Sequence, residues 1–174
     1  MIVMTEEFIN KRNEMTRCAL ENGSSERFIE LYRSSHDLRH AEPWLYEACA
    51  GGNIALVNFL ISENHSPDER NSTRLKTPAI CAACRGGHHE VVQTLLKAGV
   101  CLNVASLADN PLFSAIFARS IDCVKLLVDA GIDIHKTYDL GHRLKNALAF
   151  AIEEGCTDIA AYLLEHRAVL PKAQ

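Results

Sequence analysis

The chain has 174 residues and a formal net charge of −4, with 18 Lys and Arg against 22 Asp and Glu. We expect residues 1–174 to form a single domain, because a chain of this length can bury a sizeable core. The charge balance provides no basic stripe for binding nucleic acid, and no apolar run is long enough to span a membrane.

One spacing recurs along the chain and predicts its organisation. An alanine is followed by a glycine four residues later and by a leucine eight residues after that. The alanines are Ala19, Ala48, Ala83, Ala115 and Ala151, and the leucines are Leu31, Leu60, Leu95, Leu127 and Leu163. The glycines are Gly23, Gly52, Gly87 and Gly155, with Arg119 in the fourth place. Intervals of 29, 35, 32 and 36 residues between the alanines predict a stack of small supersecondary units.

Each unit is predicted to contain two short helices joined by a tight turn. In the third unit we expect helices over residues 79–85 and 89–98, separated by the glycine pair that ends at Gly87. Val92 and Leu95 belong to one apolar stripe on the second helix. A single helix pair cannot bury such a stripe alone, so neighbouring units must cover it.

The predicted units follow one another in chain order. We expect an N-terminal capping unit over 1–35, internal units over 42–66, 77–103 and 110–135, and a C-terminal capping unit over 145–168. A long polar helix over residues 5–22 is expected to shield the open N-terminal end. The connectors over 62–76 and 137–146 are long and polar. The predicted fold is therefore an all-α solenoid of about five stacked helix–turn–helix units with long inter-repeat loops.

Several motifs resemble the ankyrin repeat. The third unit contains Thr77-Pro78, Ala82-Ala83, Gly87-His88, Glu90-Val91-Val92 and Leu95-Leu96. The fourth contains Pro111-Leu112, Cys123-Val124-Lys125-Leu126-Leu127 and Gly131-Ile132-Asp133-Ile134. The last of these is similar to the Gly-Ala-Asp-Val that ends an ankyrin unit. The resemblance covers about residues 15–168, although the first, second and fifth units lack the Thr-Pro-Leu-His start. It implies an ankyrin-repeat solenoid that binds other proteins.

The cysteines are interpreted as packed thiols. Seven are scattered along the chain, and Cys49, Cys84 and Cys123 fall inside predicted helices. We expect reduced, buried thiols in a cytoplasmic protein, and the N-terminus lacks the basic and apolar segments of a signal peptide. Cys81, Cys84 and His88 have a spacing that could bind zinc, but the glycine pair interrupts their helix face and no second Cys pair follows. We therefore predict no metal, no cofactor and no catalytic residue.

The family resemblance implies a concave groove, lined by the hairpin tips and the first helices. The two residues that follow the paired small core positions point into it, and these are Glu21-Asn22, Ala50-Gly51, Arg85-Gly86, Phe117-Ala118 and Glu153-Glu154. Phe117 differs from the others, because an exposed aromatic side chain is a common interface anchor. The alternative is that Phe117 folds onto Phe113 and covers a neighbouring repeat.

Other aromatic and basic residues are predicted on the same side. Trp44 and Tyr46 begin the second unit, and Trp44 either joins this surface or packs against the first unit. The last connector either completes the groove or is an ordinary solvated loop. The predicted partner contacts are Trp44, Tyr46, Arg74, Arg85, Phe113, Phe117, Tyr138, His142 and Arg143.

We expect a non-catalytic protein that is monomeric when free and binds another protein. Residues 146–151 and 158–164 resemble stand-alone bacterial ankyrin proteins, some of which are immunity proteins that block a cognate toxin. The first hypothesis is therefore a dedicated binder or inhibitor of one protein. A regulatory adaptor that links two proteins is the alternative. A third hypothesis is a zinc- or thiol-dependent enzyme or redox sensor.

Overall fold

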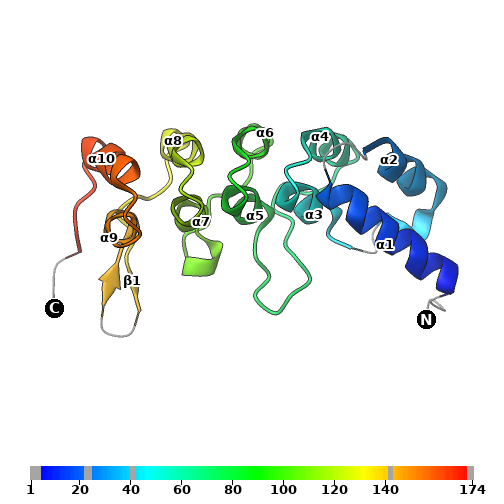
Figure 1. Cartoon of the computed structure of the whole chain (residues 1–174), viewed down its shortest axis with the longest axis horizontal. Helices are drawn as coiled ribbons and strands as arrows, with labels where there is room; N and C mark the ends of the chain where they lie inside the picture. The colour runs from blue at the N-terminus through cyan, green and yellow to red at the C-terminus, as the bar shows by residue number, and fades with distance from the viewer. Residues whose placement is uncertain (1–4, 22–24, 40–41, 141–142, 172–174) are drawn as a thin grey trace.

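The computed structural model describes residues 5–21, 25–39, 42–140 and 143–171. Five helix pairs, here called the first to fifth units, follow one another along the chain (Figure 1). They are α1 (Glu6–Leu20) with α2 (Ser25–Ser34), α3 (Trp44–Ala50) with α4 (Ile54–Ser62), α5 (Ala79–Arg85) with α6 (His89–Lys97), α7 (Pro111–Phe117) with α8 (Ile121–Asp129), and α9 (Ala147–Glu153) with α10 (Thr157–Glu165). The predicted all-α repeat solenoid is confirmed. None of the described helices is both long and apolar enough to cross a membrane.

The helices form two rows, and long connectors project from one of them. In Figure 1, α3, α5, α7 and α9 form one row, α4, α6, α8 and α10 form the other, and the termini lie at opposite ends. The connector before α5 is a hairpin closed by a bridge between Arg70 and Pro78. The connector before α9 carries β1 (Tyr138–Asp139), which runs antiparallel to β2 (Leu144–Lys145). The described connectors also include two short 3-10 helices, η1 (His36–Leu38) and η2 (Leu107–Asp109).

The recurring alanines lie where the first helices of neighbouring units pack together. All five are completely buried, and α5 packs against both α3 and α7. A larger side chain at these positions would push the helices apart. The contact is especially close at Gly51, where an added Cβ would lie 2.6 Å from the Cα of Leu20. The spacing found in the sequence therefore marks the packing surface of the stack.

The same alanines accept the hydrogen bond that closes each first helix. In the second to fifth units, the amide five residues after the alanine donates to its carbonyl oxygen over 2.8–3.0 Å; the pairs are Asn53–Ala48, His88–Ala83, Ser120–Ala115 and Cys156–Ala151. The residue before each donor has a positive φ, which is 69° at Gly52, Gly87 and Gly155 and 56° at Arg119. This geometry is a Schellman motif, which favours glycine at the left-handed position.

The second helices end in the same way, which explains the recurring leucine. In the second to fifth units, the leucine carbonyl accepts a hydrogen bond from the amide five residues later, and these leucines are Leu60, Leu95, Leu127 and Leu163. Their side chains are completely buried. The residues before the donors again have positive φ, and they are Asn64, Gly99, Gly131 and Arg167. Each leucine therefore fills the core with its side chain and ends a helix with its carbonyl.

The residue that follows the turn between the two helices of a unit contacts the preceding unit. Asn53 is 2% exposed, and its Nδ2 donates to the carbonyl oxygens of Cys18 and Glu21 at the end of α1. His88 takes the same place in the third unit, with Nε2 lying 3.2 Å from the carbonyl oxygen of Ala50. Carbonyl groups at helix ends lack partners within the helix, so these contacts satisfy them and join the units.

The C-terminal end of the stack exposes apolar side chains at positions that are buried further inside. Ile152 follows Ala151 just as Ile116 follows Ala115, yet Ile152 is 53% exposed and Ile116 is completely buried. Leu164 on α10 is also exposed, at 56%. The difference arises because, within the described structure, no further helix pair packs on this side of α9 and α10.

Leu127→Ala should lower the free energy of unfolding by about 2–5 kcal/mol, because it leaves a cavity where a completely buried side chain stood in the middle of the stack. Denaturant unfolding followed by helical circular dichroism measures this change. Gln93→Ala is the control, since Gln93 is exposed on α6 and its replacement should change stability by less than about 0.5 kcal/mol. An equally small effect of Leu127→Ala would place this leucine outside the core.

Candidate protein-binding groove

A pocket of about 480 Å³ opens between the third, fourth and fifth units. Its walls come from α5, α7 and α9 and from the connectors that follow α6 and α8. The lining residues are Arg85, Leu107, Ala108, Phe113, Ser114, Phe117, Leu140 and Phe150. A mostly apolar lining with few polar groups is typical of surfaces that take up an apolar group of a ligand.

Two positions of the repeat build this surface. Phe117 and Arg85 stand two residues after the recurring alanine of their units. Ser114 and Phe150 stand one residue before it. Glu47 takes this second position on α3. At these positions α3, α5, α7 and α9 share one face of the stack, here called the groove, whose character changes from one unit to the next.

Phenylalanine rings give the pocket its shape. Phe113 is 6% exposed, and its ring stacks on Phe150 with 5.2 Å between the centroids. The ring of Tyr138 meets Phe113 edge-on at 5.4 Å. Phe117 lies one helical turn further along α7 and is 63% exposed. Phe113 is thus a fixed part of the protein core, whereas Phe117 presents its ring to solvent.

Arg85 is the charged residue of this lining. Its side chain is exposed, and it makes no ion pair with any described residue. Glu153 holds the equivalent position on α9, but Lys145 pairs with its carboxylate. A guanidinium group without a carboxylate partner therefore lies beside the apolar surface of the pocket.

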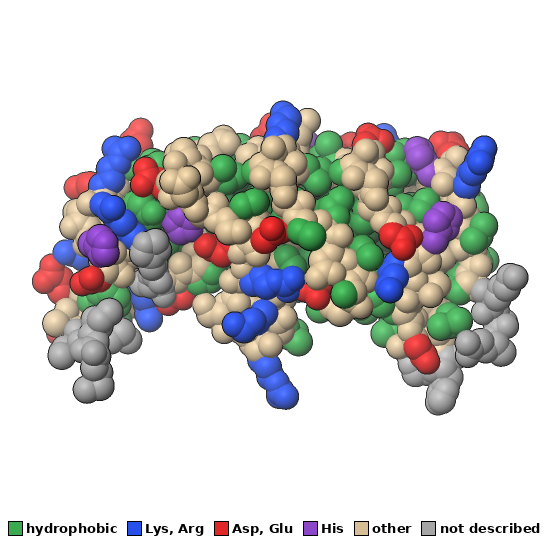
Figure 2. All heavy atoms as spheres, turned by 180° about the vertical axis from the view of Figure 1, so that it is seen from behind, with side chains coloured by type: hydrophobic (Ala, Val, Ile, Leu, Met, Phe, Trp, Pro, Cys, Tyr) green, Lys and Arg blue, Asp and Glu red, His purple; other side chains and the backbone are tan. Residues whose placement is uncertain are grey.

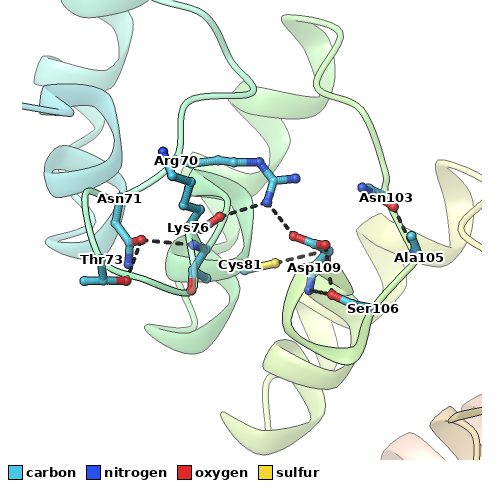
Figure 3. A network of polar contacts seen from close by, with 10 residues as sticks. Arg70, Asn71, Thr73, Lys76, Cys81, Asn103, Ala105, Ser106 and Asp109 are labelled. Carbon is cyan, nitrogen blue, oxygen red and sulfur yellow. Dashed lines mark hydrogen bonds and ion pairs between the residues drawn. The ribbon is translucent and has the colours of Figure 1, made fainter.

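A polar network ties the hairpin before α5 to the connector that follows α6 (Figure 3). Arg70 Nη1 donates to Asp109 Oδ1 over 2.5 Å and to the carbonyl oxygen of Lys76 over 2.8 Å. Asp109 also accepts a hydrogen bond from Ser106 Oγ over 2.8 Å. The hydrogen bond from Arg70 holds the pKa of the Asp109 carboxyl below its usual range. The hairpin before α5 is thereby fixed to η2, whose Leu107 lines the pocket.

Carboxylates gather at the other end of the groove, around α3. Burial of Glu47, assisted by the nearby charges of Glu42 and Glu69, raises the pKa of its carboxyl. Glu42 pairs with Arg12 over 3.4 Å, and Glu69 Oε2 lies 3.1 Å from His65 Nδ1. Glu47 makes no ion pair within the described part of the chain. The groove is therefore acidic at α3 and becomes cationic and apolar towards α7.

The chain was compared with known protein families. Residues 45–138, which are more than half of the chain, match ankyrin repeats in three copies. The protein belongs to the ankyrin-repeat family. Arrays of ankyrin repeats are typically non-enzymatic modules that bind other proteins through side chains on the repeat surface. No curated protein matches this sequence.

The pocket of this ankyrin array brings together three of the predicted partner contacts, Arg85, Phe113 and Phe117. Arg74 and Arg143 are exposed on the connectors, outside the lining of the pocket. The role of these five residues in partner binding stays a prediction. The sequence-based predictions at Asn22, Gly23 and His142 fall outside the described residues.

Trp44 is part of the core rather than of the ankyrin groove. Its side chain is completely buried, and Nε1 donates to the carbonyl oxygen of Leu38 over 2.6 Å. Its ring meets Phe28 of the first unit edge-on at 5.4 Å. The prediction that Trp44 contacts a partner is therefore wrong, because the first unit covers it. Tyr46 is half-buried, and its backbone N–H donates to Glu69 Oε1 over 3.0 Å.

Tyr138 braces the last connector. Its hydroxyl donates to the carbonyl oxygen of Val104 over 2.8 Å and accepts a hydrogen bond from Asn110 Nδ2 over 3.0 Å. Burial raises the pKa of the phenol. Tyr138 is therefore half-buried and holds the β1–β2 hairpin against the fourth unit, which differs from the solvated loop residue considered in the sequence analysis.

Five lining residues were not singled out by the sequence analysis, namely Leu107, Ala108, Ser114, Leu140 and Phe150. Phe150 precedes the alanine of the fifth unit, as Ser114 precedes that of the fourth, so the repeat register contained the signal for it. Leu107 and Leu140 lie in connectors whose paths the repeat spacing does not define. Only the three-dimensional arrangement places these two leucines beside Phe117.

The cysteine and histidine side chains considered for zinc binding have separate partners. Cys81 Sγ donates to the carbonyl oxygen of Asp109 over 3.4 Å, whereas the ring of His88 contacts Ala50. Within the described ranges, no group of three or more His, Cys, Asp or Glu side chains could hold a metal ion. These residues therefore connect units or fill the core in the described structure.

A pair of thiols lies between the third and fourth units. Cys84 and Cys123 are both completely buried. A hydrogen bond from Cys84 lowers the pKa of Cys123 to about 7, and burial raises that of Cys84 well above its usual range. Cys123 is thus an acidic thiol that solvent does not reach.

Burial should decide which of the seven thiols reacts. In the native protein, a maleimide should modify the exposed Cys101 rapidly and the six buried cysteines, including the acidic Cys123, only after unfolding. Intact-mass measurement should therefore show one adduct before denaturation and seven after it. Native Cys101→Ser protein should show none. Rapid native modification of Cys123 would contradict the packing of α8 on the stack.

Glu47→Gln should raise the melting temperature at neutral pH, because it removes a charge that burial and the neighbouring carboxylates disfavour. The pKa of Glu47 in the folded protein is raised, so ionising this carboxyl costs stability, and the full cost is present above that pKa. The cost disappears below the pKa of the unfolded chain, where both states hold the proton. Melting curves recorded from neutral pH down to below the pKa of the unfolded chain should show that the increase in melting temperature becomes smaller as the pH falls. Glu26→Gln, an exposed control on α2, should give no gain, and a pH-independent gain in Glu47→Gln would contradict this account.

Proposed function

We propose that this ankyrin-repeat protein binds one partner protein through the groove at Phe117 and inhibits that partner. The observation that carries the proposal is the exposed ring of Phe117 at a pocket with an apolar lining. Aromatic side chains bury a large area at low cost in conformational entropy, so they are frequent anchors of interfaces.

Packing does not account for this aromatic side chain. The recurring alanine and the residue after it are buried in α7, whereas Phe117 itself is 63% exposed. The equivalent positions on α3, α5 and α9 hold Ala50, Arg85 and Glu153, so the stack requires no large apolar group there. A partner that covers Phe117 would remove its ring from water and gain the free energy of that burial.

Inhibition is the finer part of the proposal. It is supported by the resemblance of residues 146–151 and 158–164 to stand-alone bacterial ankyrin proteins, some of which are immunity proteins. A rigid array can block an active surface by covering it, because the repeats supply a broad surface without a large conformational change. An immunity protein that neutralises a cognate toxin is the specific form of inhibitor that we propose.

Phe117→Glu should weaken binding to the native partner by about a hundredfold or more, because it removes the anchor and brings an unpaired charge into the interface. The partner is obtained by affinity capture on the wild-type protein and identified by mass spectrometry, and affinities are then measured with purified components. The melting temperature of Phe117→Glu should stay unchanged, since the side chain supports no core contact. Unfolding of this variant would instead show that Phe117 belongs to the core.

Leu164→Glu is the matched control, because Leu164 is 56% exposed on α10 and lies outside the pocket lining. It should bind the partner as the wild type does. Normal binding by folded Phe117→Glu would place the interface elsewhere on the array. The activity of the captured partner, measured with and without the protein, decides between inhibition and tethering. An adaptor would leave that activity unchanged and bring a second protein into the complex.

A further inference from the structure

The pocket at Phe117 carries a cation that no carboxylate of the described residues neutralises. Arg85 is exposed in the pocket lining. The chain as a whole has a net charge of −4, so the charge of Arg85 is opposite in sign to the net charge of the protein. A partner carboxylate at this place would make a charge-assisted hydrogen bond, which is stronger than a bond between neutral groups.

The hairpin before α5 adds positive charge next to the pocket. Figure 2 shows Lys and Arg side chains gathered low in the middle of the molecule, where this hairpin projects. Arg74 and Lys76 are exposed on this hairpin, whereas Arg70 forms an ion pair with Asp109. The Arg70–Asp109 pair also fixes the hairpin to η2, whose Leu107 lines the pocket. Exposed cations of this kind attract an acidic segment before it docks.

Acidic side chains at α3 restrict where a partner can place its own charge. Glu47 is half-buried and has no ion-pair partner in the described ranges, and it adds to the field of Glu42 and Glu69. A partner carboxylate at this end would meet like charges, which is unfavourable. The acidic group of a bound segment is therefore directed to Arg85.

We infer that the partner presents a segment in which a large apolar side chain lies beside Asp or Glu. The apolar side chain enters the pocket against Phe113 and Phe117, and the carboxylate pairs with Arg85. This inference rests on the proposed function and adds the chemistry of the partner. A segment with Lys or Arg in place of the acidic residue is rejected, because it would repel Arg85 and leave its guanidinium unpaired in the interface.

A random peptide library displayed on phage tests this chemistry without knowledge of the partner. The library is selected in parallel on the full-length wild-type protein, on Phe117→Glu and on Arg85→Glu. Peptides that bind the wild type and are lost on Phe117→Glu should be enriched in a large apolar residue next to Asp or Glu. The Arg85→Glu protein should instead select apolar residues next to Lys or Arg.

Synthetic peptides then measure the contribution of the charge. For a selected peptide, replacing Asp and Glu by Asn and Gln should weaken binding to the wild type by about tenfold and should have little effect with Arg85→Gln protein. Lys97→Glu is the matched control, because Lys97 is an exposed cation on α6 outside the pocket. It should keep the acidic preference and the affinity of the wild type.

The outcomes separate this inference from the proposed function. Phe117-dependent peptides without an excess of Asp and Glu, or no such peptides at all, would overturn the inference. The proposed function would still stand if Phe117→Glu failed to bind the captured partner. If Phe117→Glu bound that partner normally, both would fall. An acidic preference that survives Arg85→Glu would assign the charge recognition to other residues and overturn the inference.

Discussion

The stack depends on the close approach of the first helices of neighbouring units. Five completely buried alanines allow this approach, and Gly51 fits against α1 because it has no Cβ to meet the backbone of Leu20. With the first helices this close, the second helices of neighbouring units also pack together, and their recurring leucines are buried. The chain between units must then leave the packed rows, and the connectors before α5 and α9 project as hairpins (Figure 1).

Packing and recognition use different positions of the same helix. On α7, Ala115 and Ile116 are completely buried, whereas Phe117 is largely exposed. Ala115 and Ile116 must fit against a neighbouring helix, whereas the packing of the stack does not restrict the side chain at Phe117. The equivalents of Phe117 can therefore differ in chemistry, as Arg85 and Glu153 do. This freedom produces a groove that is acidic at one end and cationic and apolar at the other.

The number of units and the approximate position of the helices over 5–22, 79–85 and 89–98 follow from local physical chemistry, so the sequence alone predicted them. The expected helix over residues 79–85 is α5, and the expected polar first helix is α1. Apolar periodicity and the left-handed turn residue act within one unit and need no knowledge of its neighbours. Even the exception at Arg119 follows the pattern, since its φ is positive and its Nη2 donates to the carbonyl oxygen of Glu154 in the next unit over 2.6 Å.

The composition of the pocket was decided by the tertiary structure. Trp44 and Phe117 are both aromatic residues on first helices, yet the first unit covers Trp44 while Phe117 stays exposed. Leu107 and Leu140 reach the pocket because η2 and the β1–β2 hairpin fold back beside α7. Local sequence determines which residues are helical and which face is apolar. Whether a side chain on that face meets a neighbour or solvent depends on contacts between units and on connector paths, which no local pattern encodes.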